Sequence, residues 1–433
     1  MSLELLGLVG LLVMLVLMGI GVPIAFAMGL VGFLGMAYIS GWPGAFDILG
    51  QTPYSISANY TLSIIPLFVL MGELIYSSGI SEDLFDASSK WFGHWRGGLG
   101  IATIMGCAGF SAVCGSSVAT AMTMGTIAIP ELRKHGYNPA LATGCVAAGG
   151  TLGILIPPSS AFVIYGMLTN VSVSKLLMSG WLPGLMLMGL FIITTTVLCF
   201  FNPKLGPSGI KFTWRERFIS LKRIWTILLL ILIISGGMYS GVFTPNEAAA
   251  IGVAVAFILT LVLRKFSWSN TLYALRMSAT SAAMLLTIVI GAMMLNYFFT
   301  ATRLPYVLGD YIANMNVPIF VLVAVIVIVH IILGCVMDSM AVIIVLVPII
   351  FPTIIALGID PIWYGVLTVI LVEQGLITPP VGVNVFVIKG VAKDVPLSTI
   401  FRGVLPYFTA MIVSVVLLTA FPSIATFVAT TMK

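Results

Sequence analysis

Hydroxyl side chains gather with glycines in one short stretch of the chain, residues 109–125, "GFSAVCGSSVATAMTMG". Ser116 and Ser117 directly follow a glycine there, so two hydroxyls lie beside an unhindered backbone. Hydroxyl and carbonyl oxygens are the ligands that hard cations take, so this stretch could bind an alkali cation or a polar substrate group. Small residues also let helices pack closely, and we assign the nearby Thr120 and Thr123 to packing.

A carboxylate lies in a comparable stretch, "GCVMDSMAV" at 334–342, which begins at Gly334 and carries Asp338 and Ser339. A carboxylate in so apolar a run is energetically expensive and marks a functional residue by default. Asp338 could bind a cation, carry a proton or hydrogen-bond a polar substrate group. It could also simply cap the helix that follows, as Asp often does.

Two proline pairs interrupt apolar runs, in "GILIPPSS" at 153–160 and in "GLITPPVG" at 375–382. Each proline removes a backbone donor and blocks a helical turn. Non-helical backbone at membrane depth persists only when it is buried in protein or lines a water-filled cavity. The freed carbonyls could therefore hold a ligand, with Thr378 as the best hydroxyl ligand beside the second break. A plain proline kink is the alternative interpretation.

For several other polar residues the sequence allows more than one role. Asn384 could face the substrate or tie the next helical turn, and Glu373 could form a structural contact, so we assign Glu373 no role. Arg303 lies just before the expected second hairpin, 317–352, on the predicted outer side. A guanidinium can bind a carboxylate through two hydrogen bonds. It is a candidate anchor for an anionic substrate, or equally an arginine at the membrane interface. The lone His330 is assigned to packing.

The composition predicts a polytopic membrane protein. Of 433 residues, 60% are hydrophobic and only 8% are charged, against roughly 25% charged residues in soluble domains. The net charge of +5 is spread over many loops, which gives no reason to expect a nucleic-acid partner. No hydrolase, zinc or phosphate-loop motif occurs. We therefore expect that the protein is not an enzyme and has no cofactor. We expect transport driven by an ion gradient.

Apolar segments of spanning length, about 20 residues, recur along the whole chain. The segments 100–130 and 317–352 have polar, glycine-bearing centres and are expected to be re-entrant hairpins, while 138–170 and 362–388 are the broken helices. The amphipathic stretch 81–98 is expected to lie along the membrane interface. The other expected spans are 3–20, 23–40, 61–78, 176–202, 224–242, 245–264, 270–299 and 404–430.

The chain contains an internal repeat. A shift of 222 residues places Pro130, Gly136 and Pro139 on Pro352, Gly358 and Pro361, superimposes the two proline pairs, and brings Ser117 onto Ser339. Prolines and glycines in one register without a gap are not expected by chance. We therefore divide the chain into an N-terminal half, 1–203, a basic linker, 204–223, and a C-terminal half, 224–433.

Loop charges predict that the two halves are inverted. Loops beside the first hairpin carry Lys90, Arg96, Arg133 and Lys134, which favours the cytoplasm by the positive-inside rule. The matching loops of the second hairpin, 309–317 and 353–361, have Asp310 and Asp360 but no Lys or Arg, which favours the periplasm. Both termini are then expected outside. Inverted repeats with matching broken helices are typical of secondary transporters, with a binding site near the midplane.

Several motifs resemble one transporter family. The stretches "GFSAVCGSSVATA", "IPELRKHGYNPALATGCVAAGGTLGILIPPSSAFVIYG", "GLITPPVGVNVFVIKG" and, at 66–81, "PLFVLMGELIYSSGIS" resemble the DctM-like large membrane subunit of TRAP transporters (tripartite ATP-independent periplasmic transporters). The resemblance covers nearly the whole chain. It implies an all-α, inverted-repeat, elevator-type importer of the ion-transporter superfamily, driven by sodium in a bacterial inner membrane.

The resemblance also implies partners and site residues. The expected partners are a separate small four-helix membrane subunit and a periplasmic binding protein that delivers an organic acid, such as a dicarboxylate, a sialic acid or another sugar acid. Together with the polar residues described above, the resemblance gives these substrate candidates: Ser116, Ser117, Arg303, Asp338 and Asn384. The sodium candidates are Ser117, Gly149, Gly150, Thr151, Gly334, Asp338, Ser339, Gly375, Thr378 and Pro379.

Two other functions stay open at this point. One is a free-standing symporter of the same fold that needs no binding protein. The other is a channel, which would require a continuous polar pathway or charged rings. The sequence instead has isolated polar breaks within apolar repeats, so the channel is the weaker alternative.

Overall fold

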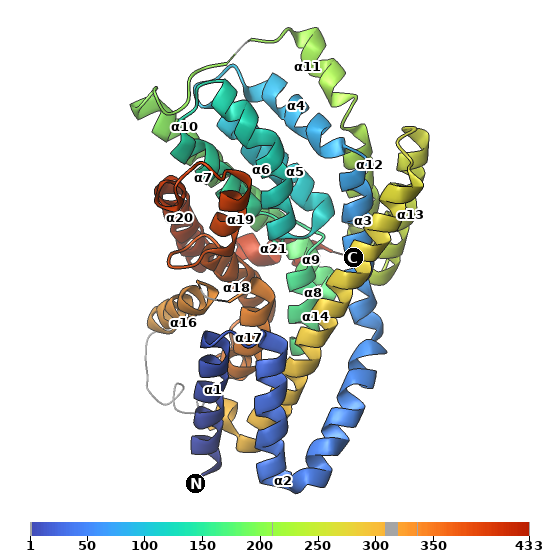
Figure 1. Ribbon diagram of the computed structural model, residues 1–433, viewed down its shortest axis with the longest axis vertical. Helices are drawn as coiled ribbons and strands as arrows, with labels where there is room; N and C mark the ends of the chain where they lie inside the picture. Colours follow the sequence, from blue (N-terminus) through green and yellow to red (C-terminus); the bar gives the residue numbers. More distant parts are fainter. Residues whose placement is uncertain (1, 210, 308–318, 336, 433) are drawn as a thin grey trace.

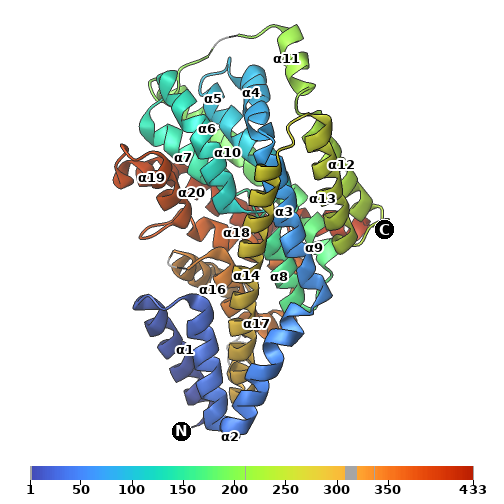
Figure 2. The same ribbon diagram turned by 45° about the vertical axis from the view of Figure 1, so that its right-hand side comes forward.

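The computed structural model describes residues 2–209, 211–307, 319–335 and 337–432, and every regular element in these ranges is a helix. The helices form an elongated body, with the N-terminus at one end (Figures 1 and 2). Within the described ranges, seven helical segments are long and apolar enough to span a membrane. The bent pair of α11 and α12 would make an eighth. This agrees with the prediction of a polytopic membrane protein.

The chain begins with long helices and a short amphipathic one. These are α1 (Leu3–Gly19), α2 (Ile24–Ser57), the 3₁₀ turn η1 (Tyr60–Ser63), α3 (Ile64–Ser77) and α4 (Ile80–Phe92). Helix α2 consists of two helical segments, because Gly41 has non-helical backbone angles (φ 77°, ψ 169°) and the chain resumes helical geometry after it. The expected span of 23–40 ends at this break.

The first helical pair and the first broken helix follow. They comprise α5 (Gly98–Cys114), α6 (Ser117–Lys134), α7 (Pro139–Gly150) and α8 (Ser160–Thr169), and then α9 (Val173–Ser179) and α10 (Trp181–Phe201).

The second part of the chain contains α11 (Trp214–Leu221), α12 (Trp225–Tyr239), α13 (Pro245–Val262), α14 (Trp268–Thr302), α16 (Ile319–Gly334), α17 (Ser339–Ala356), α18 (Pro361–Gly375), α19 (Val383–Val391), α20 (Leu397–Ala420) and α21 (Ser423–Thr431). The expected single span 404–430 is two helices, because the chain leaves helical geometry at Phe421. The predicted loop 309–317 with Asp310 lies outside the described residues.

Local structure repeats at the predicted spacing of 222 residues. Helices α6 and α17 start and end at matching positions. Gly136 and Gly358 both have positive φ, and both proline pairs contain a cis peptide bond. Asn138 caps α7 and Asp360 caps α18, each before a proline in the first helical turn. The sequence repeat is therefore also a repeat of backbone conformation.

Helix contacts between the two parts come in reciprocal pairs. Helix α8 packs on α17, and its counterpart by the 222-residue shift, α19, packs on α6. Likewise α7 contacts α20, while α18 contacts α9. On the other side of the body, α14 runs along α2 and α3 (Figure 2). The two helical pairs and the two broken helices thus form one interlocked unit beside a frame of long helices.

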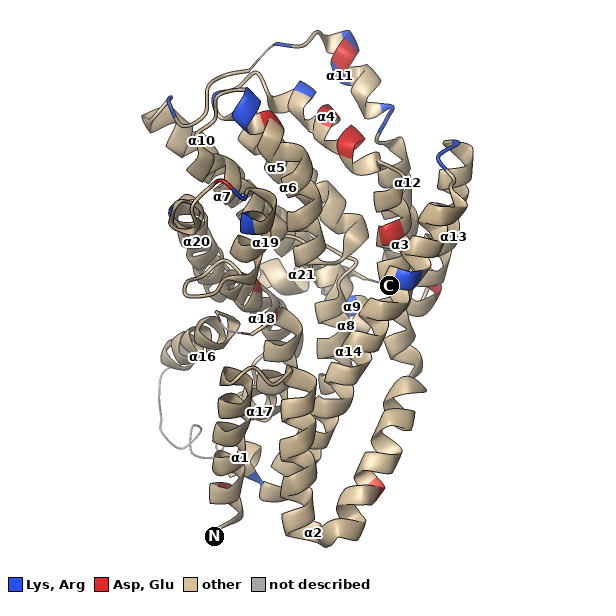
Figure 3. Ribbon diagram, in the orientation of Figure 1, with Lys and Arg blue, Asp and Glu red and all other residues tan. Residues whose placement is uncertain are grey.

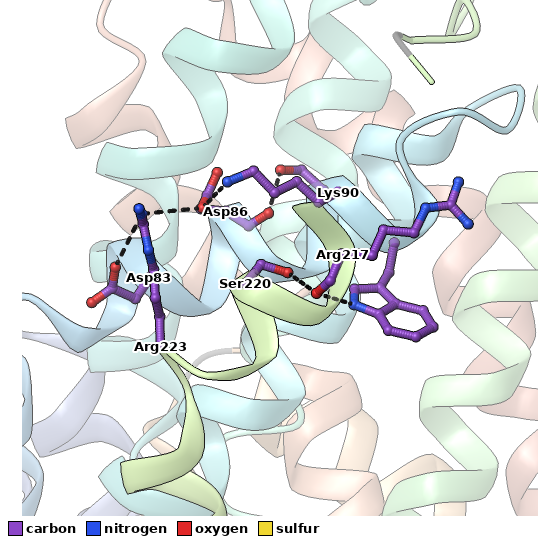
Figure 4. Close-up of polar contacts among 8 residues, drawn as sticks. Asp83, Asp86, Lys90, Arg217, Ser220 and Arg223 are labelled. Atoms are coloured by element: carbon purple, nitrogen blue, oxygen red, sulfur yellow. Dashed lines mark hydrogen bonds and ion pairs between the residues drawn. The ribbon is translucent and has the colours of Figure 1, made fainter. Parts of the chain in front are cut away.

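The linker between the halves is attached on both sides. Its first part joins the start of α5, since the Gly97 amide donates to Gly206 O at 3.0 Å and the Gly209 amide donates to Gly93 O at 2.9 Å. Its second part, α11, packs on α4. There the Trp91 indole donates to the Arg217 carbonyl at 3.2 Å (Figure 4). This end of the molecule also carries many of the charged residues (Figure 3).

Candidate functional site

The ends of both helical pairs open into one cavity of about 440 Å³. The turn between α5 and α6, the start of α17 and the end of α18 form one side, and α3 and α14 form the other. Its polar lining includes Glu73, Ser116, Ser117, Asp338, Ser339 and Glu373. Four of the predicted site residues, Ser116, Ser117, Asp338 and Ser339, therefore lie around a single space.

The first turn is held against the first proline break. Gly115 has a φ of 63°, and a Cβ atom there would lie 2.8 Å from the Pro158 carbonyl oxygen. The Ser160 hydroxyl also donates to Gly115 O at 3.4 Å. Ser116 caps α6, because its hydroxyl accepts from the Ala119 amide at 3.4 Å. Only glycine allows this approach, which sets the position of both serines.

The second helical pair is placed in a similar way. Asp338 caps α17, its carboxylate accepting from the Met340 amide at 3.1 Å, and it also lines the cavity. Capping and a functional role are thus geometrically compatible. Gly334 and Gly375 touch: a Cβ at Gly375 would lie 2.5 Å from the Gly334 Cα. These two glycines let α16 lie directly on the end of α18, so their role in the structure is close packing.

Glu373 lies where the two hydroxyl-bearing helix starts meet. Its side chain is 0% exposed, and the Ser339 hydroxyl donates to its Oε1 at 3.2 Å. The other carboxylate oxygen, Oε2, and the Ser117 hydroxyl have no hydrogen-bond partner among the described residues. The sequence alone assigns this acidic residue no role. Its position in a buried apolar helix was the signal that could have found it.

The remaining sodium candidates do not line the cavity. Thr151 donates to Ala148 O and Thr378 donates to Gln374 O, each at 2.6 Å, so their hydroxyls bond their own backbone. Gly149 and Gly150 pack closely on α5 and α6. Pro379 is exposed.

Two of the substrate candidates also lie away from the cavity lining. Asn384 is buried, and its amide donates to the Ala147 carbonyl at 3.4 Å, which ties α19 to the first broken helix. Arg303 is exposed at the C-terminal end of α14, with a φ of 60°. Neither is brought next to Asp338 or Ser117 in this conformation.

The cavity is acidic. Glu73, Asp338 and Glu373 line it, and its described lining contains no Lys, Arg or His. Buried charge is unfavourable unless an opposite charge or hydrogen bonds compensate for it. A cation would therefore be stabilised here, and an anionic group would need a cation beside it.

A multi-pass helical bundle with paired broken helices around a cavity lined by carboxylates is the architecture of a membrane transport protein. The family model of the "Tripartite ATP-independent periplasmic transporter, DctM component" matches residues 11–424. The chain belongs to this family, and it is accordingly a multi-pass inner-membrane permease subunit and not an enzyme.

Individual relatives agree with this assignment. The chain is 38% identical to the C4-dicarboxylate TRAP transporter large permease protein DctM of Pseudomonas aeruginosa, over 92% of each chain. It is 34% identical to the sialic acid TRAP transporter large permease protein SiaM of Vibrio cholerae, over 84% of this chain and 85% of the relative. The crystal structure of the Alcanivorax borkumensis YdaH transporter shares the fold. Its TM-score is 0.65 at 16% sequence identity, over 89% of each chain.

Proposed function

We propose that this chain is the translocation subunit of a sodium-coupled importer of organic acids. The observation that carries the proposal is the acidic cavity between the ends of both helical pairs. Its described lining contains carboxylates and hydroxyls but no basic residue. Sodium ions bound there would supply the positive charge that an organic anion needs. A dicarboxylate, a sialic acid or another sugar acid fits this requirement, since each carries at least one carboxylate.

The proposed transport movement is of the elevator type. The interlocked unit of α5 to α8 and α16 to α19 would carry the cavity across the membrane along the frame of α2, α3 and α14. The cavity lies between this unit and the frame, which supports the assignment of moving and fixed parts. The reciprocal helix contacts support a two-fold internal repeat. The loop charges support the proposal that its halves are inverted, with both termini in the periplasm.

The proposal includes two protein partners. A small four-helix membrane subunit, encoded as a separate chain, would complete the fixed frame, and a periplasmic binding protein would deliver the organic acid. The relatives named above are large permease proteins of TRAP transporters, which supports this expectation.

Reconstituted transport tests the proposal. Proteoliposomes with this chain, its small subunit and the loaded binding protein should accumulate the organic acid only when a sodium gradient points inward. Equal uptake with potassium, or with a proton gradient alone, would contradict sodium coupling. Uptake without the binding protein would instead favour a free-standing symporter.

A further inference from the structure

Glu373 lines the cavity together with the starts of both α6 and α17. The Ser339 hydroxyl, at the start of α17, donates to its Oε1 at 3.2 Å. Ser117, at the start of α6, lines the same cavity, and its hydroxyl has no hydrogen-bond partner among the described residues. Ser117 and Ser339 are counterparts by the 222-residue shift. One cavity lining therefore combines this carboxylate with two equivalent serines, one from each half of the chain.

This carboxylate has too few partners for a buried charge. Ser339 provides its one recorded hydrogen bond, and Oε2 has no partner among the described residues. The other charged groups of the cavity lining are Glu73 and Asp338, which have the same sign. An ionised buried carboxylate requires a counter-charge or several donors. Within the described lining, the protein supplies neither.

The residue that corresponds to Glu373 in the first half is uncharged and needs no counter-charge. The 222-residue shift places Thr151 there, and the Thr151 hydroxyl donates to Ala148 O at 2.6 Å within its own helix. The charge is thus present in only one of the two equivalent positions. At this pair of positions the protein therefore supplies one carboxylate, in addition to the Glu73 and Asp338 carboxylates of the same lining.

We propose that Glu373 is a direct oxygen ligand of a monovalent cation held between Ser117 and Ser339. The inference rests on the proposed function, which makes sodium the coupling ion, and it adds a charged ligand from α18 to the hydroxyls of the two helix starts. Oxygen ligands of this kind are those that hard cations take. Because the cation contacts both helical pairs, its binding would hold their ends together.

Sodium-dependent thermal stability of the purified full-length protein tests this inference without transport. A cation that binds the folded state raises the unfolding midpoint by mass action. In sodium chloride, compared with potassium chloride at equal ionic strength, wild-type protein should unfold at a higher temperature. Glu373→Gln should lose this sodium increment. Glu131→Gln, an equal change at the partly exposed end of α6, should keep it.

A second variant covers the case in which Glu373→Gln does not fold. Glu373→Asp keeps the charge but has a side chain shorter by one methylene, so its carboxylate lies farther from the proposed cation. The sodium concentration that gives half of the rise in unfolding temperature should be at least fivefold higher than in the wild type. A wild-type sodium response in either variant would overturn the inference while leaving sodium coupling intact. Absence of any sodium response in the wild type would contradict the proposed coupling itself.

Discussion

Single side chains decide whether the cavity can hold charge. Asp338 illustrates this, because its carboxylate both caps α17 and lines the cavity. A capping role requires only an acceptor at the helix start, which Asn provides almost as well as Asp. A role in cation binding requires the negative charge. The two roles can therefore be separated by a substitution that preserves shape and removes charge.

Asp338→Asn should reduce sodium-driven uptake by roughly tenfold or more, which corresponds to at least about 1.4 kcal/mol. It should also raise the sodium concentration needed for half-maximal uptake. Asp360→Asn is a matched control, because Asp360 caps α18 outside the cavity lining. Uptake and sodium dependence equal to wild type in Asp338→Asn would restrict Asp338 to capping. The measurement is initial uptake in proteoliposomes over a series of sodium concentrations.

Helix ends, and not helix middles, position the candidate site. The turn after α5, the start of α17 and the end of α18 each place a polar residue at the cavity. At the first of these, Gly115 combines a left-handed backbone with direct contact to the Pro158 carbonyl. A side chain at this position would disturb both the turn and its packing.

Gly115→Ala should therefore lower stability more than Gly136→Ala does. Both glycines have positive φ, but a Cβ at Gly136 meets no atom within 4 Å. Backbone strain alone should cost Gly136→Ala about 1–2 kcal/mol. In Gly115→Ala, overpacking against Pro158 should add about 1–3 kcal/mol and abolish uptake. Thermal unfolding of the two variants compares them directly, and equal midpoints would contradict the packing argument.

The sequence allowed the helix ends to be predicted because their signals are local. Proline pairs, glycines at turns and capping residues act within a few neighbours, so the breaks at Pro157 and Pro379 could be predicted without a structure. Contacts between distant segments could not be predicted in this way. The bond from Asn384 to Ala147 and the meeting of Glu373 with Ser339 depend on how helices cross. From the sequence alone, Asn384 therefore stays open between facing the substrate and tying the next helical turn, and Glu373 has no assigned role.

The molecule as a whole has the organisation expected of two structurally equivalent halves. The reciprocal pairs α8–α17 and α19–α6 show that each half packs its broken helix on the other half's helical pair. The charges at the helix ends predict which side of the membrane each half faces. Arg133 and Lys134 lie at the end of α6, whereas the equivalent end of α17 has no basic residue. The ends of these two helices should then face opposite sides of the membrane.

Single cysteines test this orientation. Lys134→Cys should react with a membrane-impermeant thiol reagent only from the cytoplasm, and its counterpart Ala356→Cys only from the periplasm. Both positions are exposed, and neither has the positive φ of the nearby Gly136 and Gly358. The unmodified chain, in which four of five cysteines are buried, gives the background. Labelling of both variants from the same side would refute the inverted arrangement.

The shared cavity also has a consequence for how the chain is made. Ser117 and Ser339 are separated by 222 residues, and at about 5–20 residues per second a ribosome needs roughly 10–45 s to synthesise that length. During this interval the first helix start lies in the bilayer without Glu373 to face its hydroxyl. The first half of the chain is therefore synthesised before the second half can complete the cavity.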